Sequence, residues 1–152
     1  MSTSANESAG SEIVCEARRE HLAELLAFVE QACVRADVEQ DVLFDVRLAV
    51  EEVVTNVIEH AYAGQEAGPV TVRFVREPGR VVVTIEDLAR PFDPATVPPV
   101  DPTAPLEARR IGGLGWHLVR RIMDEVRYER LSPRDNGHGN RVTLVKQLST
   151  TN

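Results

Sequence analysis

The chain of 152 residues has no uninterrupted apolar run near the roughly 18 residues that a membrane-spanning helix needs. Its first eleven residues are small and polar, which excludes a signal peptide there and predicts a disordered tail over 1–11. Basic residues are outnumbered, because 17 Lys and Arg face 24 Asp and Glu for a net charge of -7. Nucleic acids and anionic membranes are bound by clustered cations. We therefore expect neither as a partner, and we expect a cytoplasmic protein.

Cysteine and histidine are also sparse. Cys15 and Cys33 lie in separate segments, which predicts two reduced, half-buried thiols. The four histidines are dispersed, at His21, His60, His117 and His138. Because no pair of them has the spacing of zinc ligands, we expect no structural metal. Any chemistry has to come from other residue types.

The chain does contain an ordered series of helical and strand patterns, and its 43% hydrophobic content suits one domain over 12–149. Apolar residues at helical spacing predict helices over 19–36 and 41–62, the second one ended by Gly64. The buried stripe of the second helix would be Val42, Val46, Ala49, Val50, Val53 and Val57. Alternating patterns predict five strands, over 12–17, 69–76, 81–87, 127–132 and 140–148.

Two further segments interrupt this alternation. Six prolines in the sixteen residues 90–105 exclude a helix or an interior strand and predict a loop or lid. A glycine-rich turn then leads into a third helix. The apolar face of that helix would be formed by Leu118, Val119, Ile122, Met123 and Val126.

The second helix carries the first chemical motif. In LAVEEVVTNVIEHAY, Glu52 and Asn56 stand four residues apart and therefore lie on one face of the helix. A carboxylate can take a proton from a hydroxyl group or water, and a carboxamide oxygen suits a hard cation such as Mg²⁺. A solvated helix face that carries the two residues by chance fits as well. Asn is mildly unfavourable inside a helix, which favours a functional reason for it.

Two other motifs are compatible with nucleotide binding. Gly112, Gly113 and Gly115 precede the third helix, where backbone amides and the helix N-terminus would stabilise a phosphate. A glycine-rich turn can also be a simple tight connection. Asp87 ends a strand, where its carboxylate could accept a hydrogen bond from an amino group such as that of adenine, or cap the following turn.

Together, in this order, the motifs resemble those of the GHKL (Bergerat-fold) ATPases, and within them the small bacterial anti-sigma-factor serine/threonine kinases. The matching residues are the E-x-x-x-N-x-x-x-H series of Glu52, Asn56 and His60, then Asp87, then the GGLG box. The resemblance covers nearly the whole domain. It implies an α+β fold, a two-layer sandwich in which helices cover one face of a mixed, mainly antiparallel sheet, with a lid at about 90–112 over ATP.

The resemblance also implies a role for each matched residue. Glu52 would be the general base, Asn56 would coordinate Mg²⁺ bridging the phosphates of ATP, and Asp87 would bind the adenine amino group. The other expected nucleotide contacts are His60, Ala89, Gly112, Gly113, Leu114, Gly115 and Asn140. A basic lid residue is common in the family, but neither Arg109 nor Arg110 is assigned that role.

Two positions depart from the family pattern. Ala89 stands where the family has a glycine after the adenine-binding Asp, and its methyl group could weaken adenine binding. Asn140 follows Gly139 where the family often has a Thr, and an Asn side chain can still donate a hydrogen bond to Asp87.

The function implied is an ATP-dependent kinase that phosphorylates a Ser or Thr of an anti-anti-sigma (STAS-domain) antagonist and otherwise sequesters a sigma factor. Similar proteins are commonly dimers, so a homodimer is expected. The chain is too short to hold a phosphoacceptor-histidine domain as well, which counts against a complete sensor histidine kinase. Two alternatives remain: a module that binds ATP and sequesters its partner without transferring phosphate, and a simple ATPase.

Overall fold

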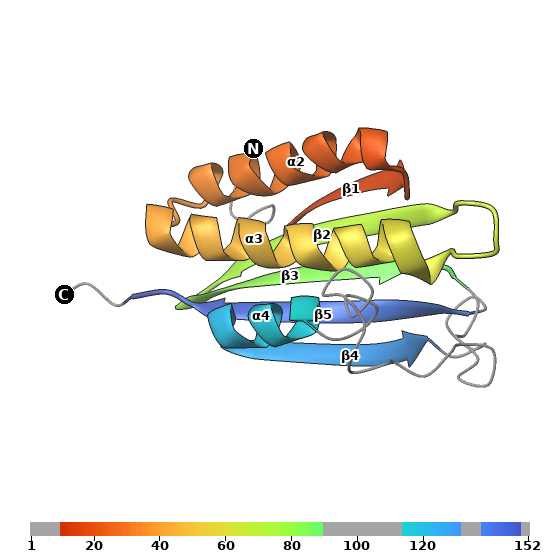
Figure 1. Ribbon diagram of the computed structural model, residues 1–152. Coiled ribbons are helices and arrows are strands. Elements are labelled where there is room, and N and C mark those ends of the chain that lie inside the picture. The colour runs from red at the N-terminus through yellow and green to blue at the C-terminus, as the bar shows by residue number, and fades with distance from the viewer. Residues whose placement is uncertain (1–9, 90–113, 132–137, 150–152) are drawn as a thin grey trace.

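Three helices cover one face of a five-stranded sheet in the computed structural model, which describes residues 10–89, 114–131 and 138–149 (Figure 1). The strands are β1 Ser11–Glu16, β2 Pro69–Glu77, β3 Arg80–Asp87, β4 Glu125–Leu131 and β5 Gly139–Gln147. The helices are α2 Leu22–Arg35, α3 Gln40–Asn56 and α4 Leu114–Ile122, with a 3₁₀ turn η1 Arg19–His21 and a π-helical turn η2 Val57–Ala61. The expected two-layer α+β fold is confirmed.

The sheet has the strand order β1-β2-β3-β5-β4. All four pairings among these strands are antiparallel, so the described part of the sheet has no parallel pair. The expectation of a mainly antiparallel sheet holds, and no described strand makes it mixed. The order places β3, which ends at Asp87, in the centre and β5 beside it.

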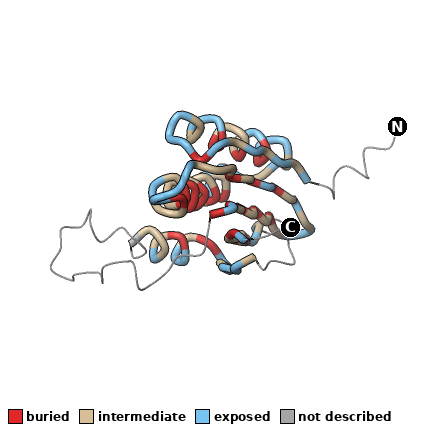
Figure 2. The backbone as a smooth tube through the Cα atoms, turned by 90° about the vertical axis from the view of Figure 1, so that its right-hand side faces the viewer, coloured by how far each residue is buried: buried red, intermediate tan, exposed pale blue. Residues whose placement is uncertain are grey.

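The core lies between the helices and the sheet, where Figure 2 shows the buried residues collected. Alternate residues of β3 are buried, as the strand pattern predicts: Val81, Val83, Ile85 and Asp87. All six residues of the predicted stripe of α3 and η2 are buried: Val42, Val46, Ala49, Val50, Val53 and Val57. Each buried valine stabilises the fold by about 1.5–3 kcal/mol, so this stripe holds the helix that carries Glu52 and Asn56 against the sheet.

The third helix is shorter than predicted. It ends at Ile122, and Val126, expected on its apolar face, lies in β4 opposite Leu144. The backbone N–H of Asp124 donates to the carbonyl of Val145 (2.9 Å), and its carboxylate accepts from the N–H of Gln147 (2.7 Å). The chain thus joins the sheet at Asp124, because pairing with β5 satisfies its backbone better than another helical turn would.

The N-terminal boundary and one thiol also differ from expectation. Ser11, assigned to the tail, pairs with Phe74 as the first residue of β1, while residues 1–9 lie outside the described part. Cys15 is half-buried as expected, but Cys33 is fully buried in α2. Burial, with Glu30 nearby, raises the pKa of the Cys33 thiol to about 12. That thiol belongs to the core.

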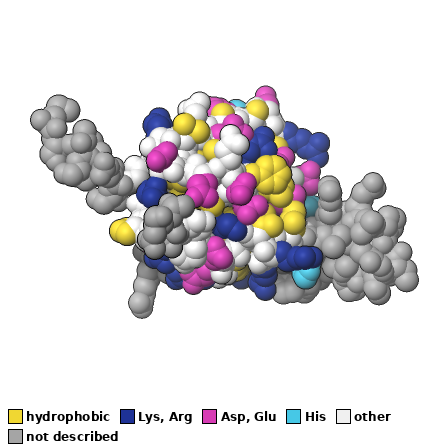
Figure 3. Space-filling model, turned by 90° about the vertical axis from the view of Figure 1, so that its left-hand side faces the viewer, with side chains coloured by type: hydrophobic (Ala, Val, Ile, Leu, Met, Phe, Trp, Pro, Cys, Tyr) yellow, Lys and Arg dark blue, Asp and Glu magenta, His cyan; other side chains and the backbone are white. Residues whose placement is uncertain are grey.

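The end of the molecule where α2 passes into α3 carries charges of both signs around a group of hydrophobic side chains (Figure 3). Val34 near the end of α2 and Phe44 near the start of α3 are exposed by 67% and 64%. None of the helices in the described ranges is long and apolar enough to cross a membrane.

Candidate functional site

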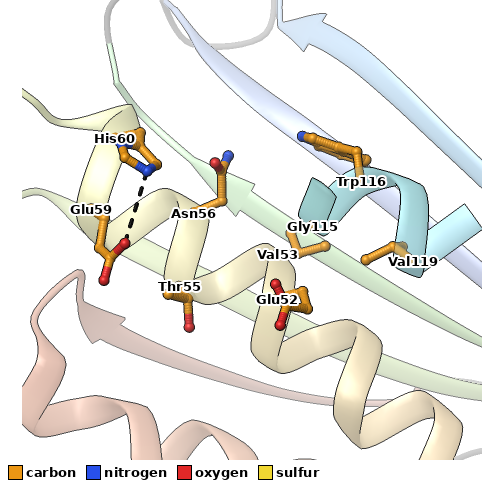
Figure 4. Close-up of a pocket in the computed structure, with 9 residues that line it drawn as sticks. All are labelled: Glu52, Val53, Thr55, Asn56, Glu59, His60, Gly115, Trp116 and Val119. Atoms are coloured by element: carbon orange, nitrogen blue, oxygen red, sulfur yellow. Dashed lines mark ion pairs between the residues drawn. The ribbon is translucent and has the colours of Figure 1, made fainter. Parts of the chain in front are cut away.

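A pocket opens between the C-terminal part of α3, the turn η2 and the first turn of α4 (Figure 4). Its empty space, including the open mouth, is about 540 Å³. The lining residues are Glu52, Val53, Thr55, Asn56, Glu59, His60, Gly115, Trp116 and Val119. The fold therefore brings four of the residues singled out in the sequence, Glu52, Asn56, His60 and Gly115, into one pocket.

Glu52 and Asn56 are half-buried in this pocket, and neither side chain has a hydrogen-bond partner among the described residues. Their backbones are fixed, because Val53 and Val54 beside them are buried in the core. An ionised carboxylate only accepts hydrogen bonds, and a carboxamide offers one acceptor oxygen. The pair thus presents a proton acceptor and a metal-binding oxygen to whatever enters the pocket.

Gly115 brings the start of α4 against Glu52. A Cβ atom at this position would stand 3.0 Å from Oε2 of Glu52, closer than most real Cβ contacts. The first turn of a helix carries unpaired N–H groups and partial positive charge, which attract a carboxylate or a phosphate. Glu52 therefore lies beside an anion-attracting helix terminus.

The helix widens directly after Asn56, where a regular α-helix was predicted as far as 62. Residues Val57–Ala61 form the π-helical turn η2. This geometry is rare in proteins overall, and where it occurs it is often at a functional site. His60 lies in this turn, with its Nε2 3.8 Å from Oε2 of Glu59, and Figure 4 shows it on the same side of the helix as Asn56. Gly64, with φ of 77°, ends the segment as expected.

Asp87 forms a second polar centre, at the end of β3. It is 4% exposed and is the buried charged residue of the described ranges. Its Oδ1 accepts from the N–H of Ala89 (2.9 Å) and from Nδ2 of Asn140 (3.0 Å). Burial raises the pKa of the Asp87 carboxyl, and these two donors offset part of the increase.

One oxygen of Asp87 thus caps the turn, which is one of the two interpretations open from the sequence. The other oxygen, Oδ2, has no hydrogen-bond partner in the part of the chain that the structure describes. Asp87, Ala89 and Asn140 do not line the pocket that holds Glu52. The predicted residues therefore form two groups, one on α3 and α4 and one at the ends of β3 and β5.

The two departures from the family pattern have structural consequences. A Cβ atom at Gly139 would stand 2.2 Å from the carbonyl oxygen of Asp87, so only glycine allows β5 to start this close to β3. That approach places Asn140 opposite Asp87 in the strand register, where its amide supplies the hydrogen bond. Ala89 is 1% exposed, so its methyl group is packed against protein.

Three aromatic residues around the site were not singled out in the sequence. The hydroxyl of Tyr62 accepts from the N–H of Leu88 (2.8 Å) and donates to the carbonyl of Pro69 (2.7 Å). Tyr128 donates to Oδ1 of Asn140, and its ring meets that of Trp116 edge to face at 6.2 Å. Tyr62 follows the His60 motif in sequence, which is a usable signal, whereas the contact of Tyr128 depends on how β4 and β5 pair.

Several predicted residues cannot be placed in the site. Gly112, Gly113, the lid at about 90–112, Arg109 and Arg110 lie outside the described residues. Leu114 is the first residue of α4. In the described ranges no group of three His, Cys, Asp or Glu side chains could hold a metal ion, so a cation here would depend on Asn56 and on a ligand's own oxygens.

Comparison with known proteins identifies the family of this architecture. Residues 15–146 match the model of the histidine kinase-like ATPase domain. The chain belongs to this family. It is 34% identical over 97 residues to the serine-protein kinase RsbW of Listeria monocytogenes, covering 61% of this chain and 62% of the relative. It is 32% identical over 113 residues to the RsbW of Bacillus subtilis, covering 72% of this chain and 67% of the relative.

A solved structure has the same fold. The crystal structure of the RsbU and RsbW domains of Rv1364c from Mycobacterium tuberculosis matches 93% of this chain and 33% of that chain, with a TM-score of 0.63 and 16% identity. At this identity the likeness shows the fold alone. The chain belongs to the histidine kinase-like ATPase family, and relatives with similar sequences are serine-protein kinases. ATP is therefore the ligand to consider for the pocket.

Proposed function

We propose that this protein is an anti-sigma factor and ATP-dependent serine/threonine kinase that phosphorylates a STAS-domain antagonist and sequesters a sigma factor. The observation that carries the proposal is the position of Glu52 in the pocket, beside the first turn of α4 and one helical turn from Asn56. The RsbW serine-protein kinases are the relatives that support the kinase class.

The proposed reaction needs a base and positioned charges. Glu52 accepts the proton of the Ser or Thr hydroxyl while the hydroxyl oxygen bonds to the terminal phosphorus of ATP. The bond between that phosphorus and the oxygen that leaves with ADP breaks. The Glu52 carboxylate suits this role because no side chain of the described residues is hydrogen-bonded to it. At the other end of the nucleotide, Oδ2 of Asp87 is free to accept a hydrogen bond from the adenine amino group.

The charges of the pocket fit a metal-bound nucleotide. Glu52 and Glu59 both line it, and two carboxylates would repel bare phosphates. A bound Mg²⁺ would neutralise phosphate charge, and Asn56 offers it a carboxamide oxygen. His60, Thr55, Trp116 and the amides at the start of α4 are further groups in the pocket that can donate to phosphate oxygens.

Phosphorylation would then control which partner is held. A phosphate adds about two negative charges to the antagonist, and this chain already carries a net charge of -7. Repulsion would release the phosphorylated antagonist and leave the protein free to hold the sigma factor. A homodimer is part of the proposal, and light scattering of the purified protein measures it.

Comparison of wild type with Glu52→Gln tests the kinase assignment. The exchange keeps the size of the side chain and removes the base, so phosphate transfer to a STAS-domain protein from the same genome should fall about 10²–10⁴-fold. ATP affinity, measured by calorimetry, should change little. Glu51→Gln is the matched control, because Glu51 is the preceding residue, lies 3.7 Å from Arg47 and does not line the pocket.

The other outcomes select the alternatives. ATP binding without transfer to the antagonist, in wild type as in Glu52→Gln, would show a module that acts by sequestration alone. Phosphate release into solution without transfer would show a simple ATPase. Binding of sigma factor is measured separately, by co-purification with and without the unphosphorylated antagonist.

A further inference from the structure

A hydrogen-bonded chain of three side chains leads from β4 across β5 to the end of β3. Tyr128 donates its hydroxyl proton to Oδ1 of Asn140, and Nδ2 of Asn140 donates to Oδ1 of Asp87. The first member is 56% exposed and the last is 4% exposed, so the chain connects the surface to a buried carboxylate. The described structure gives Tyr128 no other hydrogen bond.

The chemistry of the three groups sets the direction of the chain. An ionised carboxylate has no proton to donate, so the amide of Asn140 has to turn its NH₂ group toward Asp87. Its carbonyl oxygen then points away, where it accepts from the hydroxyl of Tyr128. Held on both sides, the amide has one orientation. Without the hydroxyl it would be held on one side only and, being half-buried, could turn toward solvent.

The ionisation of Asp87 depends on this donor. Burial of the carboxyl favours its neutral form, whereas the hydrogen bonds from Asn140 and Ala89 favour the charged form. A charged Asp87 accepts only, and it therefore suits an amino group. A protonated Asp87 could instead donate to a carbonyl oxygen. Adenine and guanine differ in this respect, with an amino group and a carbonyl oxygen at the same ring position.

We propose that Tyr128 is a positioning residue that holds the amide of Asn140 on Asp87 and so makes the site select adenine over guanine nucleotides. The proposal rests on the proposed function, since a nucleotide has to bind at Asp87 for the choice to arise. Tyr128 acts through Asn140. The edge-to-face contact with Trp116 of α4 holds its ring in place.

Tyr128→Phe tests the proposal, because it removes the hydroxyl and keeps the ring that contacts Trp116. Binding of Mg-ATP and Mg-GTP is measured by calorimetry for wild type, Tyr128→Phe, Asn140→Ala and the double variant. Loss of one such hydrogen bond should weaken ATP binding about fivefold and leave GTP binding equal or tighter. In the Asn140→Ala background, Tyr128→Phe should have no further effect.

Arg127→Gln is the matched control, since Arg127 precedes Tyr128 on the other face of β4 and pairs only with Glu125 among the described residues. It should keep the wild-type ratio of the two affinities. An unchanged ratio of ATP affinity to GTP affinity in Tyr128→Phe would overturn the proposal. A loss of ATP affinity on Tyr128→Phe that is equally large in the wild-type and Asn140→Ala backgrounds would overturn it as well. Wild-type protein that binds neither nucleotide would overturn the proposed function as well, whereas intact ATP binding separates the two failures.

Discussion

At the scale of single residues, two glycines of the site are required by close contact. Gly139 lies so near the backbone of Asp87 that a Cβ atom would overlap its carbonyl oxygen, at 2.2 Å. Gly115 lies against the carboxylate of Glu52, where a Cβ atom would stand 3.0 Å from Oε2. The first contact is with rigid backbone and the second with the end of a flexible side chain. Substitution at Gly115 should therefore displace a side chain and leave the fold intact.

Gly115→Ala should slow phosphate transfer more than it weakens ATP binding. The added methyl group would push the Glu52 carboxylate by a few tenths of an ångström, and transfer depends on its position more than nucleotide affinity does. A reduction of about tenfold in transfer rate, with ATP affinity within about threefold of wild type, is expected on this basis. Single-turnover transfer and calorimetry measure the two quantities.

Helix propensity supplies the internal control for this variant. Alanine is favoured over glycine inside a helix by about 1 kcal/mol, so the melting temperature should not fall. Equal losses of ATP binding and transfer would contradict the expected displacement of Glu52. They would indicate instead that the glycine is needed where phosphate itself approaches.

At the scale of elements, the sequence predicts positions set by local patterns better than positions set by pairing. The stripe of α3 and the alternation of β3 are both confirmed, because each follows from the period of its element. The end of α4 was predicted wrongly, because Val126 fits a helical spacing equally well. Only the bonds of Asp124 to β5 decide the boundary.

The candidate site divides in the same way. Glu52 and Asn56 could be placed together because one helix carries both. The widening of the helix at η2 and the contact of Tyr128 with Asn140 could not be foreseen, since neither has a local sequence signal. The role of Tyr62 could be predicted in part. The residue directly follows the motif, but its hydrogen-bond partners, Leu88 and Pro69, lie elsewhere in the sequence.

Tyr62→Phe should destabilise the protein at the junction of η2, β2 and β3. The variant removes the hydroxyl that pairs the N–H of Leu88 with the carbonyl of Pro69, and Tyr62 is 7% exposed. The two backbone groups are only partly buried, so loss of these hydrogen bonds should cost about 0.5–1.5 kcal/mol, which corresponds to a decrease of about 1–6 °C in melting temperature for a domain of this size. Thermal and urea unfolding measure the loss.

Tyr128→Phe is the matched control for this experiment, because it also removes one tyrosine hydroxyl, but from a side chain that is 56% exposed. Its free energy of unfolding should stay within about 0.5 kcal/mol of wild type. Equal stability of the two variants would show that the hydroxyl of Tyr62 does not hold the junction together.

At the scale of the whole molecule, the buried carboxylate of Asp87 is needed to bind adenine in the proposed function, but it lowers the stability of the fold. Asp87 lies at the end of a central strand whose other buried residues are all aliphatic. Its raised pKa means that the folded protein binds a proton there more tightly than the unfolded chain does. Between the unfolded and folded pKa values, this group therefore lowers stability as the pH rises, and the whole cost is present above the folded pKa.

Asp87→Asn should accordingly raise the melting temperature at neutral pH, by a few degrees, while abolishing stabilisation by nucleotide. The amide oxygen can still accept from Ala89 and Asn140, so the fold keeps both contacts. The difference from wild type should shrink as the pH falls below the folded pKa and vanish below the unfolded pKa, because Asp87 is neutral in both states only there. Melting curves at pH 7.5 and at acidic pH, taken as differences between the two proteins, isolate Asp87 from the other carboxylates.

Bound nucleotide should make the wild type more stable than Asp87→Asn, the reverse of the order without nucleotide. With Mg-ATP at about 100 times its dissociation constant, the wild type should gain about 2.7 kcal/mol by mass action. In Asp87→Asn the free position of the side chain is an NH₂ group, which faces the adenine amino group donor to donor, so the gain should be lost. A variant that is less stable than wild type without nucleotide at neutral pH would show that the ionised carboxylate is adequately solvated. The trade-off between adenine recognition and stability would then not exist in this fold.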